Sequence, residues 1–104
     1  MQKSKGDRIN ETNIAIFERR SFALENIPND IHEQELRDAI EYYCDGEIID
    51  IYIPFSSKVQ RQASRAFIIM SSAKDTGYLI SKFDNYFYKG KNIAAWLVTQ
   101  ERRY

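Results

Sequence analysis

Arginine and aromatic side chains are combined in one short stretch of the sequence, RQASRAFIIM, at residues 61–70. As a strand, this stretch would place Arg65 and Phe67 on one face and the apolar residues that alternate with them on the other. An exposed ring beside a guanidinium group suits the stacking of an unpaired nucleobase. The guanidinium group can also stack on a base or pair with a phosphate. Tyr52 and Trp96 alternate in the same way in two other apolar runs, so these four residues are the candidate binding surface.

Catalytic chemistry has little support in the sequence. His32 is the single histidine, and it stands where a helix is expected to start, which favours a capping or solvent-exposed role over acid–base work. The sequence contains no phosphate-binding loop, no dinucleotide glycine fingerprint and no metal-ligand spacing. We therefore expect a protein that is not an enzyme and that needs no cofactor or metal.

Length, charge and cysteine content limit the class of protein. The 104 residues suffice for about one domain, and 43% of them are hydrophobic, as in a folded globular protein. Fifteen basic and fifteen acidic side chains cancel, so a preference for nucleic acid must come from local clustering. The single cysteine fits a reducing, intracellular compartment, and no apolar run is long enough to span a membrane.

Apolar periodicity predicts four strands and two helices within residues 20–100. Alternation predicts strands near residues 21–26, 47–53, 64–70 and 93–98, and spacings of three and four predict helices over 32–43 and 73–84. Residues 1–19 are expected to form a flanking arm in which Ile14, Ile16 and Phe17 dock as a short helix or strand, and residues 101–104 a tail. The predicted order is therefore β-α-β-β-α-β.

Two right-handed β-α-β units in this order predict an α+β, ferredoxin-like sandwich, in which a four-stranded antiparallel sheet carries both helices on one face. One set of alternating residues is expected to form the core: Phe22, Leu24, Ile49, Ile51, Ile53, Ala66, Ile68, Met70, Ile93, Ala95 and Leu97. Tyr52, Arg65, Phe67 and Trp96 belong to the opposite set, and would lie on the face without helices. A sheet face that merely meets water is usually not this aromatic.

Residues 20–100 resemble the RNA recognition motif family. The family's eight-residue motif falls on residues 63–70, ASRAFIIM, and its six-residue motif on residues 22–27, FALENI. Of the three usual stacking positions, Phe67 is aromatic, whereas the other two are Ala23 and Arg65. The resemblance is that of an atypical member with degenerate motifs.

The resemblance implies that the partner is single-stranded RNA. It also implies a domain of a protein that acts in RNA processing, such as splicing, or in mRNA regulation, in the nucleus or cytoplasm. Bases would stack on the open sheet face, through Phe67, Arg65, Tyr52 and Trp96. In this family the loop between strands two and three often lies along the RNA backbone, which implies that Lys58 and Arg61 hold phosphates. We expect the isolated domain to be a monomer that does not bind membranes.

Several alternatives remain open from the sequence. Phe67 could pack under the arm or tail, Trp96 could cover the shallow position of Ala23 or serve as a packing anchor, and Arg65 could pair with Asp50. The rival function is a degenerate member of the family that binds protein. Residues 86–88, YFY, could be an interaction patch, or could close the edge of the core.

Overall fold

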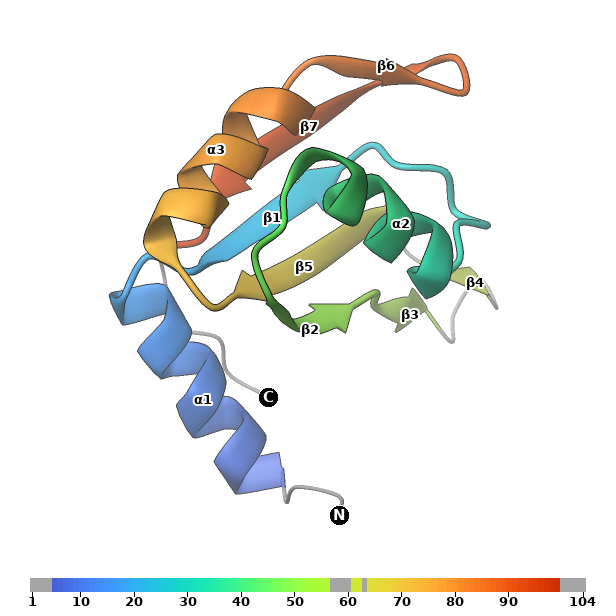
Figure 1. Ribbon diagram of the computed structural model, residues 1–104. Helices are drawn as coiled ribbons and strands as arrows, with labels where there is room; N and C mark the ends of the chain where they lie inside the picture. The colour runs from blue at the N-terminus through green and yellow to red at the C-terminus, as the bar shows by residue number, and fades with distance from the viewer. Residues whose placement is uncertain (1–4, 57–60, 63, 100–104) are drawn as a thin grey trace.

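The computed structural model describes residues 5–56, 61–62 and 64–99 (Figure 1). Three helices and seven strands occur in this part of the chain, in the following order: α1 (Lys5–Phe17), β1 (Ser21–Glu25), α2 (Glu33–Tyr43), β2 (Ile48–Tyr52), β3 (Phe55–Ser56), β4 (Arg61–Gln62), β5 (Arg65–Met70), α3 (Ala73–Phe83), β6 (Tyr86–Tyr88) and β7 (Lys91–Leu97).

One antiparallel sheet organises the fold, with strand order β2-β5-β1-β7-β6. Helices α2 and α3 lie together in front of this sheet in Figure 1 and form the second layer. We call the sheet face opposite α2 and α3 the open face. The short β3 and β4 pair with each other as a separate hairpin between β2 and β5.

The two core helices form because their apolar residues recur on one side. Leu36 and Ile40 of α2 are buried, as are Leu79 and Phe83 of α3. The side chain of Ser72 accepts a hydrogen bond from the backbone N–H of Asp75 at 3.0 Å, which satisfies a free donor at the start of α3. The burial of the apolar side chains of α2 and α3 against the sheet supplies most of the driving force for folding.

The predicted ferredoxin-like sandwich is confirmed, with a fifth strand in the sheet. The fifth strand is β6, at residues where the apolar periodicity predicted no strand. Lys89 and Gly90 both have positive φ, 50° and 84°, as in the two-residue turns that join tightly paired strands. The turn folds Tyr86–Tyr88 back onto β7 and extends the sheet at this edge.

The predicted core is largely confirmed, and Ile49 is its clear error. Ile49 is exposed, and Ile48 instead packs against the core. The pairing of β2 with β5 shifts between Ile48 and Asp50, and such a bulge changes which residues face each side of a strand. Simple alternation cannot reveal this irregularity because it depends on the partner strand.

The flanking arm contains a helix of 13 residues, α1, which lies beyond one end of the sheet in Figure 1. Of the three residues expected to dock, only Ile16 is buried, together with Ala15, whereas Ile14 and Phe17 are exposed. Arg20 fixes the connection to β1: its backbone N–H donates to the carbonyl of Ala15, and its side chain donates to the carbonyl of Met70 at 2.8 Å. The arm is thus tied to the ends of β1 and β5.

Candidate nucleic-acid interface

A single row of residues crosses four strands of the open face. Tyr52 of β2 lies opposite Phe67 of β5, Phe67 lies opposite Ala23 of β1, and Ala23 lies opposite Trp96 of β7. Neighbours in register point to the same side of a sheet, so the four side chains share one face. We call Tyr52, Phe67, Ala23 and Trp96 the aromatic row.

The rings in the aromatic row present flat surface at two places. The ring centroids of Tyr52 and Phe67 are 6.4 Å apart, and their planes differ by 23°, which makes a nearly parallel pair. Tyr52 is 37% exposed and Trp96 is 39% exposed, whereas Ala23, between Phe67 and Trp96, is only 1% exposed. The row therefore offers two aromatic areas on either side of a small residue.

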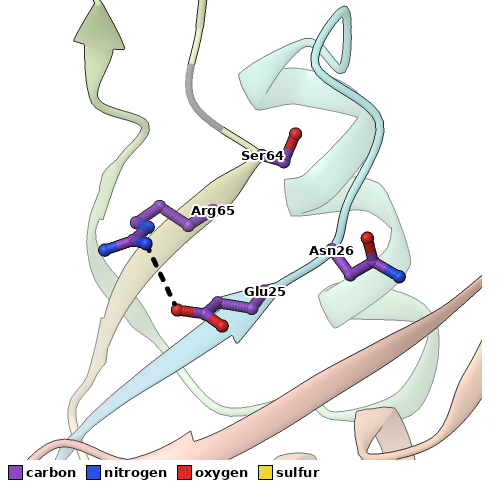
Figure 2. Close-up of a pocket in the computed structure, with 4 residues that line it drawn as sticks. All are labelled: Glu25, Asn26, Ser64 and Arg65. Atoms are coloured by element: carbon purple, nitrogen blue, oxygen red, sulfur yellow. Dashed lines mark ion pairs between the residues drawn. The ribbon is translucent and has the colours of Figure 1, made fainter.

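Arg65 lies one row further along the open face, opposite Glu25 of β1. Its Nη2 atom is 3.4 Å from Oε1 of Glu25, and both side chains are substantially exposed, at 52% and 40% (Figure 2). The alternative in which Arg65 pairs with Asp50 is wrong, because Asp50 lies opposite Ile69, at the other end of β5. The partner of Arg65 is therefore determined by the pairing register of the strands, which brings together residues that are far apart in the sequence.

Helix α1 limits the open face at the end opposite Arg65. Ser21 and Ile69 lie opposite each other in the row beyond Phe67, and both are buried. Helix α1 contacts β1 and β5 and buries its own Ala15 and Ile16. We infer that the arm covers this end of the sheet and leaves the aromatic row partly exposed.

The two predicted phosphate-binding residues fall where little is described. Lys58 lies outside the described residues. Arg61 belongs to β4, where its backbone pairs with Ser56, but its side chain is not described. The connection expected to be a plain loop therefore contains a two-stranded hairpin, which projects beside β2 in Figure 1.

Residues 86–88 divide between the two faces of the sheet. Tyr88 packs against the core, and its hydroxyl donates to the carboxylate of Glu35 on α2, which also contacts Lys89. The hydrogen bonds from Tyr88 and Lys89 hold the pKa of Glu35 below its ordinary value. The hydrogen bond between Tyr88 and Glu35 also raises the pKa of Tyr88. Tyr88 therefore closes the edge of the core.

Glu25 is an open-face residue beside Arg65 that the sequence patterns did not single out. Phe87, which belongs to the possible interaction patch at residues 86–88, lies opposite Asn92 and is exposed. Asn92 alternates with the buried Ile93, so Phe87 projects from the open face. The exposed turn at Lys89 and Gly90 was the sequence signal that could have located Phe87.

Residues 5–56, 61–62 and 64–99 contain no helix of the length and hydrophobicity required to cross a membrane. Within the same described part of the chain, histidine, cysteine and acidic residues do not gather in groups of three or more that could hold a metal ion.

The fold is similar to solved RNA recognition motif structures, although neither a protein-family model nor a curated protein matches the chain. The RRM of RNA15 with bound RNA (GU) superposes with a TM-score of 0.69 at 18% identity, over 81% of this chain and 87% of that one. The RRM3 domain of Gbp2 gives a TM-score of 0.68 at 17% identity, over 80% of each chain.

A third similar structure is the complex of the Sex-lethal protein of Drosophila melanogaster with RNA. It gives a TM-score of 0.69 at 18% identity, over 77% of this chain but 47% of the Sex-lethal chain. The present chain thus spans about half of that protein's solved length. These likenesses show that the chain has the fold of an RNA recognition motif.

Proposed function

We propose that this chain, which has the fold of an RNA recognition motif, is a single-stranded RNA-binding domain. Phe67 would be the principal stacking platform, with Tyr52 beside it and Trp96 across Ala23. The alignment of these residues in one row of the open face is the observation that carries the proposal. Solved structures of the same fold contain RNA, which adds support.

Stacking and phosphate contacts have separate roles in the proposed complex. Every base has a flat π-face, so a platform of rings binds single strands with little dependence on sequence. Arg65 would contact a base or a phosphate, and Lys58 and Arg61 would hold the backbone from the connection between β2 and β5. Phosphate contacts release counterions, so binding should weaken as salt rises. RNA processing or mRNA regulation, in the nucleus or cytoplasm, is the proposed setting.

The proposal is tested by replacing Phe67 with alanine and titrating a labelled, mixed-sequence single-stranded RNA by fluorescence anisotropy. Loss of one stacked base is worth about 1–3 kcal/mol, so affinity should fall roughly 5- to 140-fold at low salt. Wild-type affinity should also fall as salt is raised from low to moderate. Circular dichroism should show that Phe67→Ala remains folded.

Tyr42→Ala is the matched control, because Tyr42 is an 82% exposed aromatic residue on α2, on the other side of the sheet. It should bind RNA within about twofold of wild type. Equal affinity of Phe67→Ala and wild type would contradict the proposal. No binding of RNA at any salt concentration, together with capture of a protein through the aromatic row, would favour the rival protein-binding function.

A further inference from the structure

An open hollow of about 410 Å³ lies where β1 ends and β5 begins, one row of residues from the aromatic row (Figure 2). Glu25, Asn26, Ser64 and Arg65 line it. Arg65 and Glu25 point toward one another from neighbouring strands, as Figure 2 shows. Arg65 is two residues from Phe67 on β5, which is about 7 Å along a strand. The hollow is therefore within reach of a nucleotide next to one stacked on Phe67.

The carboxylate of Glu25 is an unexpected group on a surface that would bind RNA. A carboxylate repels phosphate, so Glu25 opposes the electrostatic attraction that gives nucleic-acid binding most of its sequence-independent affinity. The same group is a strong acceptor for the N–H donors on the edge of a base. Its position beside Arg65 places an acceptor and a donor next to each other at one site.

Guanine matches this pair of charges better than the other bases do. Its Watson–Crick edge has two adjacent donors, N1–H and the N2 amino group, which fit the two oxygens of a carboxylate. Its O6 and N7 atoms are adjacent acceptors, which fit the parallel N–H groups of a guanidinium. Adenine and cytosine each offer only one amino donor group on that edge, and uracil offers a single imide N–H.

The ion pair is arranged so that a base can engage it. The 3.4 Å separation of Nη2 and Oε1 is long for a charge-assisted hydrogen bond, which is usually 2.7–2.9 Å. Both side chains are exposed, so their mutual attraction is screened by water and can be exchanged for contacts to a ligand at small cost.

We propose that Glu25 and Arg65 form a guanine-selective subsite beside the aromatic row. Glu25 accepts hydrogen bonds from N1–H and the N2 amino group, while Arg65 donates to O6 and N7 or stacks on the base. The inference rests on the proposed RNA-binding function and adds a base preference to it. It also gives Glu25, which a purely phosphate-binding surface would not need, a specific role.

The test compares three single-stranded hexamers, UGUGUG, UAUAUA and UCUCUC, binding to the wild-type chain. The varied base occupies every second position of the hexamer, so it can reach the subsite in either of the two registers in which the strand can bind. UGUGUG should bind about 10-fold more tightly than the other two, as expected for one base recognised by two hydrogen bonds. Replacing guanine by inosine, which lacks the N2 amino group, should remove a substantial part of this preference.

Glu25→Gln should reduce the ratio between UGUGUG and UAUAUA to within about twofold, without weakening the binding of UAUAUA, because a negative charge is removed. Glu41→Gln is the control: Glu41 is exposed on α2, so this variant loses the same charge and should keep the wild-type ratio. Thermal unfolding should show that both variants are folded.

The two proposals fail in different ways. Binding of all three hexamers that depends on Phe67 but shows no guanine preference would overturn the subsite alone. A guanine preference that survives Glu25→Gln would also overturn it. If none of the hexamers binds, both the subsite and the RNA-binding function are overturned.

Discussion

Two groups of aromatic residues lie on opposite sides of the sheet and use their rings differently. On the open face, the planes of Tyr52 and Phe67 differ by 23°, so the two rings lie nearly parallel. On the helical side, Tyr43 meets Phe83 edge to face at 87°, and Phe83 meets Tyr86 at 79°. We call Tyr43, Phe83, Tyr86 and Tyr88 the helical-side cluster.

The difference shows why aromatic content alone does not identify a binding surface. In the helical-side cluster, Phe83 meets two rings edge to face, while Tyr86 and Tyr88 stack with their planes 25° apart. The hydroxyls of this cluster are used internally: Tyr88 donates to Glu35, and a hydrogen bond with Tyr86 raises the pKa of Tyr43. These rings stabilise the packing of α2, α3 and β6. In the aromatic row, Tyr52 and Trp96 are more than a third exposed and lie on the face without α2 and α3, whereas the similarly exposed Tyr86 is engaged with Phe83 and Tyr43.

Among the variants that test this comparison, Phe83→Ala should have the largest effect, and that effect should be a loss of stability. Phe83 is buried at the centre of the helical-side cluster, so truncating it leaves a cavity and removes two edge-to-face contacts. The free energy of unfolding should fall by about 3–5 kcal/mol, measured by urea denaturation. A loss below about 1 kcal/mol would show that the cluster is not a packing unit.

Trp96→Ala should have the opposite pattern, with loss of RNA affinity and little loss of stability. Trp96 is partly exposed and lies across Ala23 from Phe67. If it stacks on a base, anisotropy should show affinity reduced by about 1–3 kcal/mol. Unchanged RNA binding together with a large drop in stability would make Trp96 a packing anchor, like the rings of the helical-side cluster.

Tyr88→Phe should have the smallest effect, and that effect should depend on pH. The variant removes one hydrogen bond to a partly exposed carboxylate, so the free energy of unfolding at pH 7 should be about 1 kcal/mol lower than in the wild type. RNA affinity should be unchanged. Urea denaturation of both proteins across pH gives the measurement.

The direction of the pH dependence follows from the pKa of Glu35, which is lower in the folded chain than its ordinary value of 4.5. A lowered pKa contributes stability above the unfolded value and loses it as pH falls through the folded value. The difference between wild type and Tyr88→Phe should therefore be present at pH 7 and shrink below about pH 4.5. A difference that stays constant down to pH 3 would contradict the hydrogen bond to Glu35.

The sequence predicted the fold because alternation and helical spacing are local. Phe67 and Trp96 could be placed opposite the core from their neighbours alone. The bulge at Ile49, the pairing of Arg65 with Glu25 and the fifth strand all depend on contacts between distant segments. Periodicity can therefore place a side chain on a face, but it cannot supply the register that sets its neighbours.

The candidate site was predicted to a smaller extent. The common row of Tyr52, Phe67 and Trp96 agrees with the expected open-face set, whereas their roles and that of Arg65 remain proposals. The side chains of Lys58 and Arg61 are not described. Glu25 was not selected, because an acidic side chain does not suggest RNA binding until its arginine partner is known.

The fluorescence of Trp96 during RNA titration tests the central claim most directly, because Trp96 is the only tryptophan in the chain and lies in the aromatic row. The account predicts saturable quenching of its emission by single-stranded RNA, with a midpoint that shifts to higher RNA concentration as salt is raised. RNA binding that is detected by anisotropy but leaves Trp96 emission unchanged would contradict stacking on the open face.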